Sequence, residues 1–402
     1  MVGNRNVYIL MAAQACFLAT SMAVVSFSGL AGKLLSSNPA YATLATSLVI
    51  AATALSTAPM SMLMQRKSRR FGFRLGSLFG VAGGLVGTYS LYSGSFFLLC
   101  FASVLLGPFQ SSAQYYRFAA AESVPAGHTA KAISMVLVGG LLAAIVAPTF
   151  TSIFVDAAQP NQYMGAYMFV VVTTLLSLVP LAFFKPLDKP LVEEGVVDVS
   201  SGVPTRPLGQ ILRTPVFVVA VLNSALGFAM MSFVMTATPL AMSYCGFGSD
   251  VSLRVIQGHV IAMFLPSLFT GHLIKKFGLV PILLAGHALF AVAFITALSG
   301  IEIWQFSVSL IALGVAWNFC FIGGSTLLTQ AHSENEKGKV QGLNEFIVFG
   351  MSAVASFGAG VLLDMFGWHA VNQTAFAMLV IAAGATIFWG LSADARKVKD
   401  LS

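Results

Sequence analysis

Charged residues are scarce in this sequence: Asp, Glu, Lys and Arg make up only 9% of its 402 residues, against about 25% in soluble domains. So few charges cannot cover a water-facing surface, which excludes a soluble enzyme and a disordered chain. Cysteine is scarce too, and the four residues are too far apart for a CxxC metal site or a disulfide framework. Hydrophobic residues make up 57% of the chain, and the mean hydropathy is +0.86. The composition therefore predicts a polytopic membrane protein.

Long apolar runs are abundant instead. A run of about 20 apolar residues crosses a bilayer as a helix, and two groups of such runs occur. The polar, proline-containing stretch 185–213 separates the groups as a linker, and its end at 208–213 is expected to form a short surface helix. We expect an all-α membrane protein with twelve transmembrane helices in two pseudo-symmetric six-helix bundles, at 1–184 and 214–402. The expected spans are 7–32, 41–64, 75–93, 96–120, 132–155, 164–184, 215–240, 255–274, 279–299, 303–329, 341–363 and 369–391.

Positive charges are distributed unevenly between these spans. With the amino terminus in the cytoplasm, all but three of the 21 Lys and Arg residues fall on the cytoplasmic side. Lys33 and Arg254 lie outside, and Arg117 lies within a span. Cytoplasmic loops carry such an excess of cations. The distribution predicts an integral protein of the plasma membrane (the inner membrane of a bacterium) with both termini in the cytoplasm.

The two halves repeat a short basic motif. Arg69-Arg70-Phe71-Gly72 follows the second span, and Lys275-Lys276-Phe277-Gly278 follows the eighth span 206 residues later. Corresponding segments share the same orientation, so the repeat is parallel. Repeats of this kind occur in transporters whose halves rock around a central site.

Over essentially the whole chain, the sequence resembles the major facilitator superfamily. The loop signature of that family, G-x-x-x-D-R-x-G-R-R, aligns with residues 65–74, where Gln65 replaces the first glycine and Arg69 replaces the acid. In the second copy, Lys275 stands where an acid belongs. The resemblance implies a secondary transporter that works by alternating access. It also implies that the first, fourth, seventh and tenth helices line a central cavity.

Polar residues form a stripe on the fourth span, where Gln110, Gln114 and Arg117 recur at the spacing of one helical face. Asn318 on the tenth span lies 208 residues after Gln110, so the repeat puts two amides at equivalent depth. Because one cation and several amides occur without a central acid, we expect a small organic anion or zwitterion as substrate. The expected substrate-binding residues are Gln14, Gln110, Gln114, Arg117, Asn223 and Asn318.

Arg117 has two interpretations, because a charge inside a bilayer is costly. It is either a cavity cation that binds an anionic group, or a residue that reaches the cytoplasmic interface or pairs structurally with an acid. In the family, the acid of the loop signature packs against the start of the eleventh helix. Here Arg69 replaces that acid and Glu345 lies on that helix, so we expect Arg69 or Arg70 to pair with Glu345 in a cytoplasmic gate. The expected gate residues are Arg69, Arg70, Gly72, Lys275, Lys276, Gly278 and Glu345.

Coupling to a proton or another ion is not evident in the sequence. No acid lies near the middle of an expected span, where proton-coupled transporters commonly carry one. Glu122, Glu345 and His287 are the remaining candidates. We expect Glu122 to pair structurally with the basic segment 66–74, and an isolated histidine is more often a packing residue than a proton relay.

Glycines on the fifth and eleventh spans are expected to permit close helix approach. They include Gly139, Gly350, Gly358 and Gly360. The aromatic run Trp317, Phe319 and Phe321 would suit an apolar ligand wall, but packing between helices explains it as well.

Two alternative functions stay open. One is efflux of amphipathic compounds by proton antiport, and the other is a receptor or scaffold that keeps the fold without transport. A membrane enzyme is excluded because the sequence has no P-loop, no H-E-x-x-H motif and no cluster of His, Cys, Asp or Glu. We expect no cofactor and no nucleic acid, and a monomer whose partners are the bilayer and a small-molecule substrate.

Overall fold

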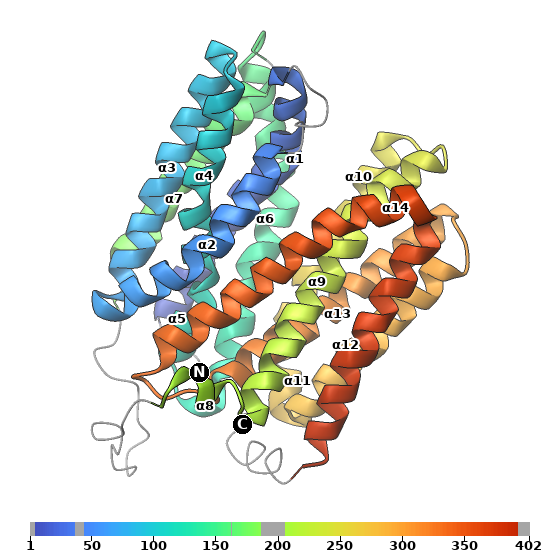
Figure 1. Ribbon diagram of the computed structural model, residues 1–402. Coiled ribbons are helices and arrows are strands. Elements are labelled where there is room, and N and C mark those ends of the chain that lie inside the picture. Colours follow the sequence, from blue (N-terminus) through green and yellow to red (C-terminus); the bar gives the residue numbers. More distant parts are fainter. Residues whose placement is uncertain (1–4, 37–43, 162, 186–205, 393–402) are drawn as a thin grey trace. The chain divides into compact units, whose positions relative to one another are not determined.

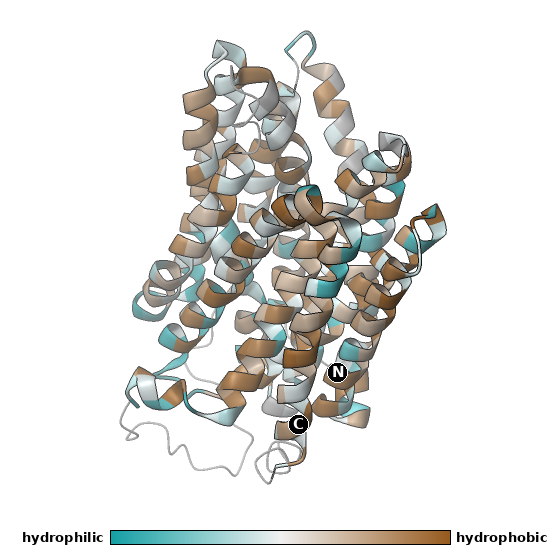
Figure 2. Ribbon diagram, turned by 45° about the vertical axis from the view of Figure 1, so that its right-hand side comes forward, coloured by the Kyte–Doolittle hydropathy of each residue, from teal (hydrophilic) through white to brown (hydrophobic). Residues whose placement is uncertain are grey.

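The computed structural model describes residues 5–36, 44–161, 163–185 and 206–392, and every regular element in these ranges is a helix (Figure 1). Hydrophobic residues predominate along the helices (Figure 2). The helices are α1 (Arg5–Leu35), α2 (Leu44–Arg66), α3 (Arg69–Ser93), α4 (Phe96–Gln114), α5 (Tyr116–Glu122), α6 (Thr129–Ala157), α7 (Met164–Phe183), α8 (Leu208–Ile211), α9 (Pro215–Tyr244), α10 (Ser249–Phe264), α11 (Thr270–Phe277), α12 (Leu279–Leu298), α13 (Ile303–Leu328) and α14 (Lys337–Gly390), with 3-10 turns at Ala126–His128 and Leu265–Leu268.

The helices match the twelve expected spans. In the described part of the chain, ten helices are long and apolar enough to cross a membrane, and the bent pair α10 and α11 forms an eleventh span. α14 contains two spans, because Gly367 interrupts it with a φ of 78°. Figure 1 shows its two limbs meeting at a sharp bend. The prediction of an all-α membrane protein with twelve spans is therefore confirmed.

The observed helix boundaries clarify the structure of the basic motif and of the end of the linker. α3 begins at Arg69, six residues before the expected span, and the Ser68 hydroxyl accepts a hydrogen bond from the Phe71 N–H as its N-cap. The basic motif is thus the first turn of a helix and not a loop. Most of the expected linker lies outside the described residues, but its end forms the short helix α8 that the sequence predicts.

The chain forms two compact units. The first comprises Met1–Ser123, Val136–Leu191 and Gln341–Phe346, and the second comprises Val124–Met135, Val192–Val340 and Ile347–Ser402. Two helices contribute to both units. α6 begins in the second unit and continues in the first, whereas one short segment of α14 belongs to the first unit and its remainder belongs to the second.

Small residues and hydroxyl groups hold the helices of the first unit together, as is usual between helices in a membrane. A Cβ atom on Gly107 would lie only 2.4 Å from the Cβ of Ala52, so α4 and α2 are in backbone contact. Between α1 and α7 the hydroxyls of Thr20 and Thr173 are 2.7 Å apart. α4 and α1, the helices with most of the polar stripe, are thus packed on α2 and α7 respectively.

In the second unit, an ion pair attaches the segment before α8 to the turn before α14. The Arg206 guanidinium donates to both oxygens of Glu336, at 2.9 and 2.7 Å, and the Arg206 backbone N–H donates to the same carboxylate at 2.8 Å. These donors hold the pKa of Glu336 well below its usual value, chiefly through the hydrogen bond from Arg206. The carboxylate therefore stays charged and anchors the described end of the linker.

The glycines give a direct test of helix packing. A Cβ on Gly139 would lie 2.1 Å from the backbone oxygen of Met11, whereas none of the described residues has an atom within 4 Å of a Cβ on Gly384. We expect Gly139→Ala to destabilise the protein by about 1–3 kcal/mol through overpacking, and the matched Gly384→Ala to be neutral or to stabilise it by up to about 1 kcal/mol. Thermal unfolding of both variants in detergent measures the difference. Equal midpoints would contradict the close contact of α6 with α1.

The expectation about the eleventh span is wrong for two of its glycines. A Cβ on Gly350 or Gly360 would meet nothing within 4 Å among the described residues, and a Cβ on Gly358 would make only an ordinary contact with Phe233. The first limb of α14 instead borders a groove of about 450 Å³ with α9 and the second limb. Gly350 and Gly360 therefore do not mediate close packing with any of the described residues.

Candidate functional site

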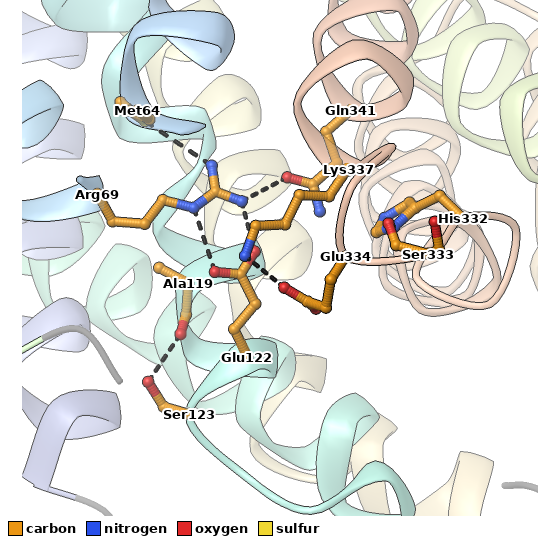
Figure 3. A network of polar contacts seen from close by, with 10 residues as sticks. All are labelled: Met64, Arg69, Ala119, Glu122, Ser123, His332, Ser333, Glu334, Lys337 and Gln341. Carbon is orange, nitrogen blue, oxygen red and sulfur yellow. Dashed lines mark hydrogen bonds and ion pairs between the residues drawn. The ribbon is translucent and has the colours of Figure 1, made fainter. Parts of the chain in front are cut away.

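Arg69 is the centre of a polar network in the first unit. Its Nε and Nη2 atoms donate to the two oxygens of Glu122, at 3.2 and 2.5 Å, and Nη2 also donates to Oε1 of Gln341 at 2.6 Å (Figure 3). The side chain is buried. The expected pairing of Glu122 with the basic segment 66–74 is therefore present. The network links α3 and α5 to the start of α14.

Glu345 has a different partner from the one expected. Nη2 of Arg117 donates to Oε1 of Glu345 at 2.5 Å, and the side chains are only 3% and 0% exposed. The expected pair of Glu345 with Arg69 or Arg70 is wrong by one helical turn, because Arg69 binds Gln341, which precedes Glu345 by four residues on the same face of α14. Of the two interpretations of Arg117, the geometry matches pairing with an acid.

The neighbours of this ion pair satisfy it only in part. Nη1 of Arg117 donates to the backbone oxygen of Gln114 at 2.9 Å, and its guanidinium lies 4.5 Å from the ring centre of Phe118. The Asn344 amide donates to Oε1 of Glu345 at 2.7 Å. The other carboxylate oxygen of Glu345 is buried without a hydrogen-bond partner among the described residues. The pair is thus a buried charge pair with one vacant acceptor.

The other residues of the basic motif bind the end of a neighbouring helix. Arg70 and Arg74 both donate to the backbone oxygen of Ala182, at 2.6 and 3.3 Å, and so cap the last turn of α7. A Cβ on Gly72 would lie 2.3 Å from Cγ of Met64, which explains why a glycine allows α3 to pack on α2. These residues act on packing, beside the Arg69 network.

The second copy of the motif is not equivalent. Lys275 and Lys276 are exposed in the last turn of α11, where cations stabilise a helix terminus. Gly278 has a φ of 88°, a conformation that favours glycine, and it joins α11 to α12. A buried charge network therefore forms around the first copy, whereas the lysines of the second copy face solvent.

The glutamines of the expected substrate site all belong to the first unit. Gln14 is buried on α1, and Gln110 and Gln114 are partly exposed on α4. The hydroxyl of Ser21, two helical turns after Gln14, donates to Oε1 of Gln110 at 2.8 Å. The polar stripes of α1 and α4 are thus brought onto a shared face.

The two asparagines have other uses in the second unit. The amide of Asn223 donates to the Thr386 hydroxyl at 2.8 Å, toward the second limb of α14. Asn318 is fully buried and uses both ends of its amide: it donates to Met263 O and Ser267 Oγ and accepts from the Thr270 hydroxyl, each at 2.7 Å. These contacts hold the 49° break of the eighth span. Nothing in them supports substrate binding by Asn318.

The break has a further partner from α6. The Ser134 hydroxyl donates to Ser267 O and accepts the N–H of Gly271 at 3.3 Å. A Cβ on Gly271 would lie 2.7 Å from Cα of Lys131. Sequence reasoning missed this contact, which joins the start of α6 to the start of α11.

His287 is buried on α12, and neither ring nitrogen has a hydrogen-bond partner among the described residues. It is therefore an isolated polar group. In the same ranges, no three His, Cys, Asp or Glu side chains come together as a metal site would require.

Aromatic rings gather on one side of α13 in the second unit. Trp317 stacks on Phe321 with ring centres 4.6 Å apart, and Phe228 contacts Trp317, Phe321 and Phe349 at 5.7, 5.8 and 5.4 Å. The sequence singles out Trp317 and Phe321 but misses Phe228 and Phe349, which lie on α9 and α14. No local pattern connects residues so distant in sequence.

Comparison with known proteins gives consistent results. The sequence profile of the Major Facilitator Superfamily matches residues 9–257 and 256–401. The riboflavin transporter RfnT of Brucella anthropi is 40% identical over 378 residues, which cover 94% of both chains. The fold is similar to that of the proton:xylose symporter XylE (TM-score 0.76, 13% identity, 96% and 95% coverage) and of the human organic anion transporter MFSD10 (TM-score 0.75, 14% identity, 95% and 99% coverage).

These matches span nearly the whole chain and agree with its many apolar helices. They identify an integral membrane protein that transports a small solute and is not an enzyme. The chain belongs to the Major Facilitator Superfamily.

Proposed function

We propose that this protein transports riboflavin, or a closely similar flavin, by alternating access. The observation that carries the proposal is the 40% identity with a riboflavin transporter over 94% of both chains. The buried ion pair supports it as well. The charge of Arg117 is already compensated by Glu345, so the cation on which an anionic or zwitterionic substrate depends is not available. Riboflavin is uncharged at neutral pH and needs no such cation.

The glutamines of the first unit are the candidates for the polar part of the substrate. Riboflavin carries a ribityl chain whose hydroxyls both donate and accept hydrogen bonds, and amide side chains match this need. Gln110 accepts from Ser21 through Oε1, and its amide nitrogen can donate to a hydroxyl. Gln14 and Gln114 extend the same polar face. We propose that these three side chains bind the ribityl chain.

The Arg117–Glu345 and Arg69–Gln341 contacts are proposed as the cytoplasmic gate. Both hold the segment Gln341–Phe346 of α14 within the first unit. The protein is proposed to lie in the plasma membrane with both termini in the cytoplasm. The distribution of Lys and Arg along the sequence supports this orientation. Glu345 is the proposed coupling acid, because protonation of its vacant oxygen would remove the charge that holds Arg117. Glu122 is engaged by Arg69, and His287 is isolated.

Uptake of radiolabelled riboflavin into proteoliposomes tests the proposal. We expect saturable uptake that excess unlabelled riboflavin abolishes, with empty liposomes as the background. Gln110→Leu should reduce uptake, whereas Gln373→Leu, at an exposed position on the second limb of α14, should not. Uptake of an organic anion without uptake of riboflavin would overturn the proposal. Extrusion of several unrelated amphipathic compounds would favour the efflux alternative.

A further inference from the structure

The aromatic cluster of the second unit combines two features that packing alone leaves unexplained. Trp317 is only 3% exposed, and its indole N–H has no acceptor in the part of the chain that the structure describes. A buried donor without a partner is unfavourable in a low-dielectric environment. Phe228, which touches three other rings, is itself only partly buried. The cluster therefore has an unused hydrogen-bond donor and a ring that is not fully covered.

The arrangement of the rings is suited to a planar aromatic ligand. Trp317 and Phe321 are nearly parallel, at 16°, and Phe228 meets them at 73° and 60°. Phe264 of α10 and Trp317 are arranged edge-to-face, with ring centres 5.8 Å apart. Aromatic pairs prefer these offset-stacked and edge-to-face arrangements. A further ring can join such a cluster with the same geometry, by placing its face or edge against Phe228.

We propose that the cluster of Phe228, Trp317, Phe321 and Phe349 binds the isoalloxazine ring of the substrate, an inference that rests on the proposed transport of riboflavin. Isoalloxazine is a flat, uncharged tricycle whose edge carries carbonyl oxygens and ring nitrogens that accept hydrogen bonds. Phe228 provides the stacking surface, and the indole N–H of Trp317 donates to an acceptor on the ring edge. Charged side chains are absent from the four, which matches an uncharged ligand.

The uneven chemistry of the two units supports this assignment. The polar face of the first unit carries amides and a hydroxyl, among them Gln14, Gln110 and Ser21. The corresponding helices of the second unit carry the aromatic cluster, while Asn223 and Asn318 are engaged in packing. Within the second unit, the aromatic cluster is accordingly the candidate site for the ring.

Riboflavin binding to the purified full-length protein in detergent tests the inference, with the fluorescence of riboflavin as the signal. An adjacent indole quenches flavin fluorescence, so the wild type should quench it on binding. Trp317→Phe should relieve the quenching and weaken binding about fivefold, by removing one hydrogen-bond donor. Phe228→Ala should weaken binding about tenfold or more, as expected for loss of a stacking surface. Trp304→Phe, at an exposed tryptophan, is the matched control and should change neither.

Ring and chain fragments distinguish the two parts of the substrate. Lumichrome, which has the ring without the ribityl chain, should compete with riboflavin in the wild type and lose this ability in Phe228→Ala. Ribitol should compete equally in both proteins. Phe228→Leu and the unfolding midpoints of all variants show whether a loss reflects misfolding. Unchanged binding and quenching in a folded Phe228 or Trp317 variant would overturn the inference and leave riboflavin transport standing. Absence of riboflavin binding to the wild type would instead overturn the proposed function.

Discussion

Replacing Glu345 with glutamine is expected to destabilise the folded protein by about 3–5 kcal/mol and to abolish transport. The substitution keeps the shape of the side chain but leaves the Arg117 guanidinium, which is 3% exposed, without a counter-charge. Removal of one partner of a buried ion pair has an effect of this size, because the remaining charge cannot be solvated. The free energy of unfolding in detergent and riboflavin uptake in proteoliposomes are the two measurements.

Double variants separate the structural part of this effect from the gate. Apolar replacement of both residues, Arg117→Met with Glu345→Leu, should restore most of the stability, since buried ion pairs and well-packed apolar residues are often equally stable. The charge swap Arg117→Glu with Glu345→Arg should restore transport in part. If the pair forms in only one of the alternating states, the loss of about 3–5 kcal/mol in Glu345→Gln shifts their populations by about two to four orders of magnitude. The apolar pair has no loss of this size but lacks the proposed coupling acid Glu345, so it should be stable and inactive.

A partly exposed pair provides the control. Lys337 and Glu334 are 2.7 Å apart, with side chains that are 21% and 39% exposed, and such pairs contribute about 0–1 kcal/mol. Lys337→Ala should leave both stability and uptake close to wild type. Full activity of the apolar Arg117–Glu345 replacement would contradict the gate. Wild-type stability of Glu345→Gln would contradict the buried ion pair itself.

The fold could be predicted from the sequence because the bilayer permits few solutions. Each apolar run between charges must form a helix to satisfy its backbone, so the charges alone mark the twelve spans. The misplaced boundaries have local causes. α3 begins six residues early because Ser68 caps it, and α14 continues through Gly367 without an intervening loop. Neither cause changes the hydrophobic pattern.

The candidate site was predictable in residue type but not in pairing. The sequence showed the polar stripe that includes Arg117, and it also showed the acid Glu345. Which side chains pair depends on helix rotations of about one turn, and the sequence does not show these rotations. α4 ends at Gln114 and α5 starts at Tyr116, and a break of this kind changes the direction of every later side chain. Asn318 was misjudged for a related reason. Its partners Met263, Ser267 and Thr270 lie at a helix break that the smooth apolar run 255–274 conceals.

Replacing Asn318 with leucine is the second change with a large expected effect. The leucine side chain fills the space but makes none of the three hydrogen bonds, so Met263 O, Ser267 Oγ and Thr270 Oγ1 lose the amide that joins them. Hydrogen bonds between membrane helices contribute about 0.6 kcal/mol on average and up to about 1.7 kcal/mol each. Loss of three bonds at a break held also by Ser134 predicts a destabilisation of about 2–4 kcal/mol. Thermal unfolding in detergent measures it.

Asn372 is the matched asparagine for this experiment. It is also fully buried, but among the described residues its one hydrogen bond, at 3.0 Å, goes to Trp368 O within its own helix. Asn372→Leu should therefore change the free energy of unfolding by less than about 1 kcal/mol. If Asn318 maintains the break and does not touch the substrate, the folded fraction of Asn318→Leu should bind riboflavin with wild-type affinity. Loss of binding at wild-type stability would return Asn318 to the substrate site, where the sequence first placed it.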